Sequence, residues 1–168
     1  SVCPESRQWP TALLSHVCLR ITDGTHQSPR FEPEGLPFLF VSNIVDGEIN
    51  FETRRFISEE TWRTLTRNCR IERNDILYTT VGSYGNAAIV DTDRRFAFQR
   101  HISHIKPDIS KIDPQYLVAV LQSPAVRYQA DRQARGVAQK TLNLKELKSF
   151  RISVPPIDVQ RDFARARV

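Results

Sequence analysis

Short apolar runs separated by glycine, proline and polar clusters divide the chain into many small elements. Phenylalanines at 38 and 40, and again at 96 and 98, alternate as on a half-buried strand and are expected to lie in the core. This pattern predicts strands at residues 38–44, 76–81, 86–90, 96–105 and 150–154. A short element is expected at 13–21, followed by a loop at 22–37.

Turn residues connect several of these strands. Asp46–Gly47 between apolar runs predicts a hairpin that leads into an extended piece at 48–51. Residues 82–85, with the sequence GSYG, form a tight turn between the second and third strands. Arg73, Asn74 and Asp75 indicate a further turn before residue 76.

Capping residues mark the helix starts. Ser58 is expected to cap a helix whose first turn holds two glutamates and whose buried edge holds Trp62 and Leu65. Asp113 and Ser123, each followed by proline, predict helices at 114–122 and from 124 to Gly136.

Two more helices complete the pattern. Asn143 with Glu146 three residues later is typical of a capping box on a short helix. Residues 159–166 are expected to be helical. Strands come first and helices gather later with few βαβ units, so 168 residues predict a single α+β domain with a mixed twisted sheet and several short helices.

Charge is distributed unevenly along the chain. Residues 1–93 hold 9 Lys/Arg and 13 Asp/Glu, whereas residues 94–168 hold 15 and 6. A basic half beside a mildly acidic half indicates one surface that faces a polyanion, although a basic protein that binds no nucleic acid has the same balance.

The remaining composition excludes several classes of protein. The cysteines at 3, 18 and 69 match no zinc or disulfide spacing, and no apolar run is long enough for a signal peptide or a membrane helix. These features indicate a reducing cytoplasm and no membrane partner.

The residue patterns of common enzymes are missing. No glycine-rich cofactor loop follows a strand, and residues 154–157 (VPPI) lack the polar first residue and aromatic last residue of an amino-methyltransferase motif. Ser83 lacks the glycine spacing of a nucleophile elbow. We therefore expect no cofactor and no catalytic residue.

Two groups of residues could suggest a metal site, but their expected positions argue against it. Asp108 with the distant Glu146 and Lys148 imitates the acidic and lysine residues of metal-dependent nucleases, but Glu146 falls in an expected helix rather than on a neighbouring strand. His101 and His104 should point to opposite faces of a strand. No metal site is expected.

Nine segments in fixed order carry the strongest signal. They are residues 21–26 (ITDGTH), 36–39 (LPFL), 43–49 (NIVDGEI), 75–82 (DILYTTVG), 84–90 (YGNAAIV), 98–102 (FQRHI), 105–107 (IKP), 136–142 (GVAQKTL) and 152–156 (ISVPP), followed by Gln160. Over nearly the whole chain, this order resembles the target-recognition domain of type I restriction-modification specificity subunits.

The resemblance implies a non-catalytic reader of double-stranded DNA that directs a methyltransferase (M) subunit and, through it, a restriction (R) subunit. It implies a recognition domain at 1–156 and the start of a spacer helix at 157–168. Family members carry two such domains, so the single domain implies an excised piece, a half-length subunit that dimerises, or a degenerate copy. Related domains in type IIG and type IIB enzymes are the main alternative.

Polar residues in the loops are the candidate DNA contacts. Arginine can pair with guanine and glutamine with adenine, and lysine neutralises phosphates. The expected DNA-binding residues are Thr25, His26, Gln27, Ser83, Tyr84, Asn86, Gln99, Arg100, His101, Arg132, Arg135, Gln139, Lys140 and Thr141. By resemblance, Pro155, Pro156 and Gln160 mark the side that binds the methyltransferase.

Each group also has a structural interpretation. The charges of residues 127–135 could form a solvated helix face, and Arg100 could be a charge on an edge strand. Residues 22–26 could be only a turn in which Asp23 binds backbone amides. A metal-dependent nuclease and a degenerate module that binds protein but not DNA are the competing functions.

Overall fold

The computed structural model describes residues 9–167, so Cys3 lies outside the described residues. The α+β class is confirmed. The elements in chain order are β1 (Thr11–Leu13), the 3-10 helix η1 (Leu14–Val17), β2 (Cys18–Asp23), β3 (Leu36–Leu39), the 3-10 helix η2 (Val41–Asn43), β4 (Ile44–Val45), β5 (Glu48–Ile49), β6 (Phe56–Ile57), α1 (Glu59–Thr66), β7 (Ile76–Thr79), β8 (Ala87–Ile89), β9 (Ala97–Phe98), β10 (Ile102–Pro107), α2 (Pro114–Leu121), α3 (Pro124–Gln133), α4 (Leu144–Lys148), β11 (Arg151–Ser153) and α5 (Ile157–Ala166).

A four-stranded antiparallel sheet in the order β2-β10-β7-β8 forms the centre of the molecule. Strand β10 pairs with β2 on one side and with β7 on the other. The mixed part of the fold is a separate sheet in the order β6-β3-β9, where β3 pairs antiparallel with β6 and parallel with β9. The pairs β4–β5 and β1–β11 complete the strand pairing among the described residues.

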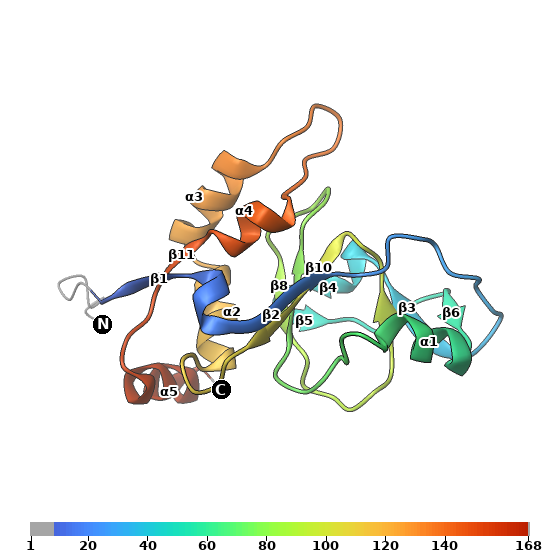
Figure 1. Cartoon of the computed structure of the whole chain (residues 1–168), viewed down its shortest axis with the longest axis horizontal. Coiled ribbons are helices and arrows are strands. Elements are labelled where there is room, and N and C mark those ends of the chain that lie inside the picture. The colour runs from blue at the N-terminus through green and yellow to red at the C-terminus, as the bar shows by residue number, and fades with distance from the viewer. Residues whose placement is uncertain (1–8, 168) are drawn as a thin grey trace.

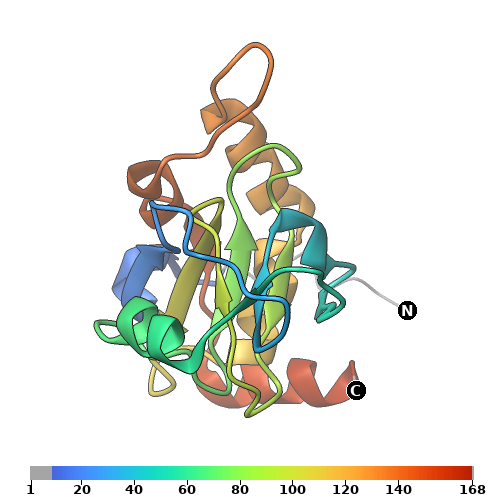
Figure 2. The same cartoon turned by 90° about the vertical axis from the view of Figure 1, so that its right-hand side faces the viewer.

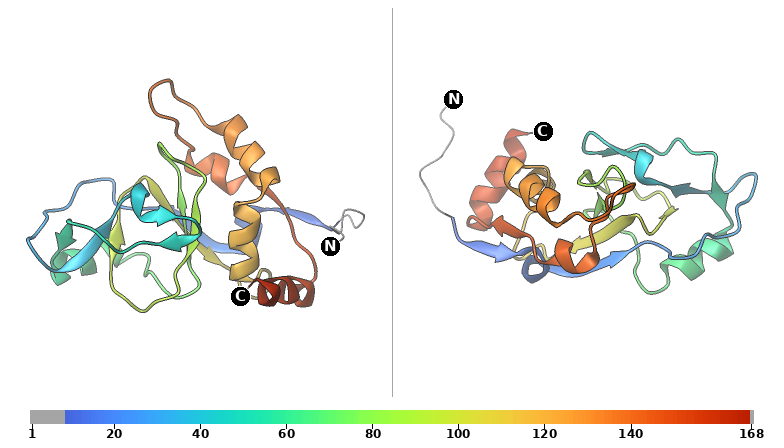
Figure 3. Two further views of the ribbon diagram at one scale, coloured as in Figure 1. Left: turned by 180° about the vertical axis from the view of Figure 1, so that it is seen from behind. Right: turned by 90° about the horizontal axis from the view of Figure 1, so that it is seen from above.

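The molecule is elongated, with helices α2 to α5 at one end and α1 with β3 and β6 at the other (Figures 1 and 3). The largest hydrophobic cluster lies between the central sheet and α2 to α4, where the Tyr78 and Phe150 rings meet edge to face at 6.2 Å. A smaller cluster around Phe38 and Ile57 supports the far end. No helix among the described residues is long and apolar enough to cross a membrane.

Most of the expected helix starts are confirmed. The side chains of Ser58, Asp113 and Ser123 each accept a hydrogen bond from the backbone N–H three residues later. The expected capping box at Asn143 is wrong, because the Asn143 side chain makes no capping hydrogen bond. Helix α3 ends at Gln133 rather than Gly136, since Ala134 is already extended, and α5 begins at residue 157 rather than 159.

Two expected strands are interrupted. Residues 38–44 are not one strand, because the buried Asn43 side chain accepts from Phe40 N at 2.8 Å and donates to the carbonyls of Asn50 and Glu52. These bonds turn the chain into η2 after β3. The Asp46–Gly47 hairpin between β4 and β5 is confirmed, with positive φ at both turn residues.

Residues 96–105 are also not one strand. They form β9 and β10, which belong to different sheets and are separated by a turn at 99–101. The N–H of Ile102 donates to the Gln99 carbonyl at 3.1 Å and closes this turn. The phenylalanines at 38, 96 and 98 are buried as expected, whereas Phe40 is half-buried.

The fold predicts that Asn43→Ala lowers the free energy of unfolding by about 2 kcal/mol or more, because it leaves one buried donor and two carbonyls without their partner. Urea denaturation of the purified protein measures this loss. Asn68→Ala is the control, since Asn68 is exposed and should change stability by less than about 0.5 kcal/mol. Equal effects of the two changes would contradict this role of Asn43.

Candidate nucleic-acid interface

The strand directions bring three loops to one edge of the central sheet. Because β2 and β7 both run antiparallel to β10, the ends of β2 and β7 lie beside the beginning of β10. Residues 24–27 follow β2, residues 80–86 follow β7, and residues 99–101 precede β10. We call this edge, with the loop at 134–142, the loop edge.

Close backbone contact fixes the first of these loops against the third. Gly24 N donates to Ile102 O at 3.1 Å, Thr25 N donates to Phe98 O at 3.3 Å, and Arg100 N donates to Thr25 O at 3.1 Å. A Cβ atom on Gly24 would lie 2.4 Å from Gln99 O and 2.5 Å from Phe98 O. Only glycine permits this approach of two backbones.

The loop at 134–142 is attached to the end of β7 by backbone hydrogen bonds. Gly82 N donates to Lys140 O at 2.8 Å, and Leu142 N donates to Thr80 O at 2.7 Å. Arg135 and Thr141 exchange two further bonds of 2.9 and 2.7 Å, which close the loop into a narrow projection. It extends beyond the rest of the molecule between α3 and α4 (Figures 1 and 2).

Two adjoining depressions lie at the loop edge, and Val81, His101 and Gln139 line both of them. The first has a volume of about 350 Å³, and the second has a volume of about 590 Å³. The expected DNA contacts that line the first are His26, Arg100, His101, Gln139 and Thr141, and those that line the second are Ser83, Asn86, Gln99, His101 and Gln139.

Eight of the fourteen expected contact residues therefore gather in one place, and the other six do not line these depressions. Arg135 and Lys140 belong to the projecting loop, and Thr25 donates its hydroxyl proton to the Gln27 carbonyl at 2.9 Å in the neighbouring loop. Arg132 lies on α3, where its guanidinium donates to the Tyr128 hydroxyl at 3.0 Å.

Tyr84 connects the loop edge to α3. Its hydroxyl donates to Asp131 Oδ1 at 2.7 Å, and this bond raises the pKa of Tyr84. The Arg127 guanidinium lies 4.8 Å from the centre of the Tyr84 ring and donates to the Tyr84 carbonyl at 2.8 Å. Arg127 is therefore engaged in holding the loop, and α3 is only partly a free solvated face.

The charges at the loop edge favour an anionic partner. None of the ion pairs within residues 9–167 includes Arg100, Arg135 or Lys140, and all three side chains are exposed. Partial burial, together with the charge of Arg100, lowers the pKa of His101, so its neutral ring offers one donor and one acceptor at neutral pH.

The structural interpretations of two residues are corrected. Arg100 is not a charge on an edge strand, because it lies in the turn between β9 and β10. Among the described residues, Asp23 binds side chains rather than backbone amides: its Oδ1 accepts from the Ser103 hydroxyl at 3.1 Å, and its Oδ2 lies 3.7 Å from His26 Nε2. The expectation that His101 and His104 share a strand is also wrong, because His101 precedes β10.

Sequence reasoning missed several residues that line the depressions, among them Asp23, Ser42, Asp46, Thr80 and Asn143. Asp46 could have been found, since the hairpin turn was evident. Ser42 reaches the site only through tertiary folding, and no local signal marks it. Asn143 directly follows the loop at 134–142 and was interpreted only as a helix cap.

The residues that imitate a nuclease are not arranged as one. Asp108 follows β10 and accepts hydrogen bonds from both the N–H and the hydroxyl of Ser110, whereas Glu146 and Lys148 belong to helix α4. Within residues 9–167, no group of three or more His, Cys, Asp or Glu residues could hold a metal ion.

The residues expected to contact a partner lie at the start of α5. Pro156 is exposed, whereas Pro155 and Gln160 are buried. The Gln160 amide accepts from Asp113 N at 2.8 Å and donates to Pro155 O at 2.8 Å, which fixes α5 against the segment before α2. A partner contact by these residues stays a prediction, and for Gln160 it would act through the position of α5.

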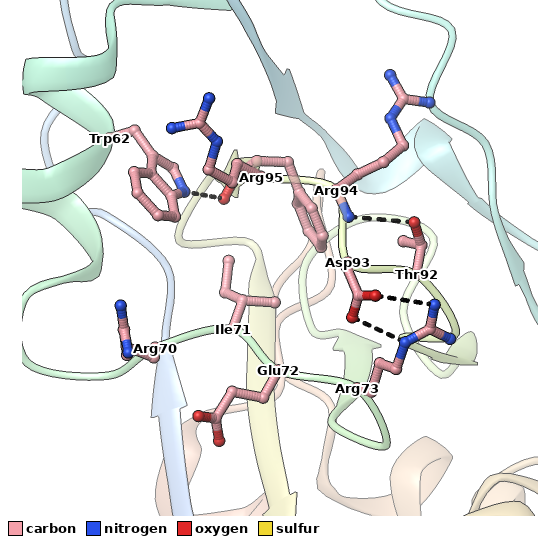
Figure 4. Close-up of a pocket in the computed structure, with 10 residues that line it drawn as sticks. Trp62, Arg70, Ile71, Glu72, Arg73, Thr92, Asp93, Arg94 and Arg95 are labelled. Atoms are coloured by element: carbon pink, nitrogen blue, oxygen red, sulfur yellow. Dashed lines mark hydrogen bonds and ion pairs between the residues drawn. The ribbon is translucent and has the colours of Figure 1, made fainter.

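A separate hollow of about 410 Å³ lies at the opposite edge of the central sheet, before β7 and after β8 (Figure 4). Arg73 forms a bidentate ion pair with Asp93, and the Trp62 indole donates to the Phe96 carbonyl at 2.9 Å. None of the expected contact residues lines this hollow. The loop edge therefore remains the candidate interface.

Comparisons with known proteins agree with one another. Residues 43–166 match a family described as "Type I restriction modification DNA specificity domain". The chain is 34% identical over 132 residues to the type I restriction enzyme EcoBI specificity subunit of Escherichia coli, which covers 79% of this chain and 28% of that protein. The chain thus spans less than a third of that curated relative.

Solved structures show the same fold. One is a structure of a type I R-M system, described for its complex assembly and conformational transition. The match covers 99% of this chain and 38% of that chain, with a TM-score of 0.68 and 19% identity. The type I restriction-modification S subunit from M. genitalium matches 99% of this chain and 40% of its own with a TM-score of 0.67 and 14% identity.

The close approach at Gly24 predicts that Gly24→Ala lowers the free energy of unfolding by about 1 to 3 kcal/mol, because the added methyl group overlaps two backbone carbonyls. Urea denaturation measures the change. Ser28→Ala, at an exposed position of the same loop, is the control and should stay within about 0.5 kcal/mol of the parent. An unchanged midpoint for Gly24→Ala would refute the tight contact.

Proposed function

Because the chain belongs to the family of type I restriction-modification DNA specificity domains, we propose that its loop edge reads the base sequence of double-stranded DNA. The observation that carries this proposal is the convergence of four loops, with eight expected contact residues, on two adjoining depressions. Polar loop side chains on a rigid sheet are the usual setting for recognition.

The cationic residues of the loop edge would bind phosphates. Arg100 and Lys140 are exposed and make no ion pair within the described residues, so their charge is available to neutralise the DNA backbone. Lys145 and Lys148 on the adjoining helix α4 are exposed as well and extend this charge. Such contacts supply affinity for any sequence and weaken with salt.

The projecting loop at 134–142 would enter a groove. Gln139 lies between the two depressions, where its amide can pair with adenine, and Arg135 can pair with guanine. The Val137 side chain near the tip is fully exposed, which costs free energy in water and suits contact with a thymine methyl group.

The partners follow from the family. Specificity subunits are generally non-catalytic, and we propose that this chain likewise has no activity of its own, binds no cofactor, and directs a methyltransferase subunit and, through it, a restriction subunit in the cytoplasm. A second recognition domain or a second copy of this chain would read the other half of the target. We propose residues 1–156 as the reading domain and 157–168 as the start of the spacer helix on the methyltransferase side.

Three other functions can be distinguished by experiment. A recognition domain of a type IIG or IIB enzyme would read DNA in the same way but would be joined to its own enzymatic domains. A degenerate module would copurify with the methyltransferase without binding duplexes. Cleavage of DNA with Mg²⁺ that is lost in Asp108→Ala would instead establish a nuclease.

We expect Gln139→Ala to change the order of preferred sequences in a selection from random duplexes, with a loss of about 1 to 3 kcal/mol at one base position, because a base contact is lost. The selection is run with the methyltransferase subunit present. Gln115→Ala, which removes an exposed glutamine on α2, is the matched control and should leave the preferred sequence unchanged. Unchanged preference in Gln139→Ala would remove Gln139 from the reading surface.

We expect Lys145→Ala to weaken binding to all duplexes alike and to reduce the slope of log affinity against log salt by about 1, because it removes one phosphate contact. Fluorescence anisotropy across a salt series measures the slope. Lys111→Ala, an exposed lysine between β10 and α2, should leave the slope unchanged. A parent protein that ignores duplexes at low salt, even beside the methyltransferase, would overturn the proposed function.

A further inference from the structure

A thiol, an imidazole and a carboxylate are aligned outside the loop edge. Cys69 Sγ lies 3.4 Å from His104 Nδ1, and His104 Nε2 lies 2.6 Å from Asp75 Oδ2. Cys69 follows α1, Asp75 precedes β7, and His104 is part of β10, so three separate segments supply the three groups. DNA reading by the loops uses none of them.

The His104 imidazole is held in one orientation. His104 is buried on the central strand, where it is paired with Thr22 of β2 and Leu77 of β7. The Phe98 ring meets the imidazole edge to face at 5.8 Å. Cysteines are activated when the thiol lies beside a base and a third group orients that base. Cys69, His104 and Asp75 have this arrangement.

The carboxylate is fixed by further hydrogen bonds. Asp75 Oδ2 accepts from Glu72 N at 2.9 Å and from Lys106 Nζ at 2.8 Å, and Lys106 also pairs with Glu72 at 3.1 Å. Asp75 is 5% exposed, so it stays in place to hold a proton on the imidazole.

The charged groups around Cys69 favour its thiolate. Burial raises the pKa of the thiol, but hydrogen bonds from His104 and Thr22 and the charges of His104 and Arg20 outweigh it, and the pKa of Cys69 is lowered. Burial likewise disfavours the charged imidazole, yet the bonds to Asp75 and Cys69 raise the pKa of His104. The charged groups that face the cluster are Arg20, Asp23, Glu72, Asp75 and Lys106.

The same chain contains a contrasting cysteine. Burial and the nearby Asp108 carboxylate raise the pKa of Cys18 to about 12. Cys18 makes no hydrogen bond to an imidazole within the described residues, so it serves as an internal control for Cys69.

A small pocket gives access to the thiol. Its volume is about 230 Å³, and Cys69 and His104 line it together with Thr22, Asp23, Gly24 and Phe98. Cys69 is half-buried, so its sulfur adjoins both the pocket and the imidazole. A reagent of a few atoms fits this space.

We propose that Cys69 is a covalent modification site for small electrophiles, with a hydroperoxide as the natural class of reagent. The thiolate attacks the terminal oxygen of the hydroperoxide, the O–O bond breaks, and the departing hydroxide or alkoxide takes the proton of the His104 imidazolium. The sulfur loses two electrons and becomes a sulfenic acid, the peroxide is reduced, and water is released when the reagent is hydrogen peroxide.

The added oxygen enters the pocket beneath residues 22–25. This segment is held by the bonds of Gly24 N to Ile102 O and of Thr25 N to Phe98 O, and Phe98 itself packs on His104. Modification of Cys69 therefore loosens the start of the first loop of the loop edge.

The first experiment compares the rates at which iodoacetamide alkylates Cys69 and Cys18 in the native chain, by peptide mass spectrometry over a range of pH. We expect Cys69 to react about tenfold or more faster at neutral pH, with a midpoint below the ordinary thiol value of about 8.5. Unfolding in urea should remove the difference. Equal native rates, or an ordinary midpoint for Cys69, would overturn the proposal.

A variant tests the electrostatic cause without disturbing the buried groups. Arg20 is exposed, and its guanidinium donates to the carbonyl of Asn68, next to Cys69. Arg20→Gln should move the midpoint of Cys69 alkylation to higher pH, whereas Arg161→Gln on α5 should not. Identical midpoints for both variants would show that the charge near Cys69 does not tune it.

Oxidation provides the direct test. The chain is treated with hydrogen peroxide and then with dimedone, and we expect the dimedone adduct on Cys69 and its absence in Cys69→Ser. Hydrogen exchange of the Gly24 and Thr25 amides should rise in the oxidised parent and stay unchanged in treated Cys69→Ser. Equal adducts on Cys18, or unchanged exchange, would refute the site or its effect on residues 22–25, and neither readout requires DNA.

Discussion

The pairing of β10 with both β2 and β7 is the constraint on which the rest of the structure depends. It satisfies the backbone of β10 on both sides and buries His104 and its neighbours Ser103 and Ile105. It also brings the ends of β2 and β7 to the beginning of β10, which creates the loop edge. A change of one residue in this register would reverse every side chain of β10 and separate the loops.

Local patterns predicted the elements that local interactions determine. The caps at Ser58, Asp113 and Ser123 and the hairpin at Asp46 depend on atoms within a few residues, and the structure has them. The interrupted strand at 38–44 depends instead on Asn43, whose amide binds residues 7 and 9 positions away. A single asparagine in an apolar run gives no sign of such bonds.

The candidate site was partly predictable for the same reason. The resemblance marked loops that the structure brings together, and eight of the expected residues line the two depressions. It could not show that Tyr84 is tied to Asp131 across 47 residues, or that the split between β9 and β10 places residues 99–101 in a turn. Asn143 occupies the N-cap position of α4 as predicted, but its side chain makes no capping hydrogen bond and lines a depression beside Thr141.

The projecting loop at 134–142 is attached to the body through main-chain atoms, with Leu142 buried at its base. The side chains at positions 137–140 are all exposed, so they contribute little to the packing of the described residues. Substitutions at these positions can therefore change what the loop contacts while the scaffold keeps its shape. A laboratory library randomised at these positions should yield mostly folded proteins, which makes the loop a suitable starting point for new specificities.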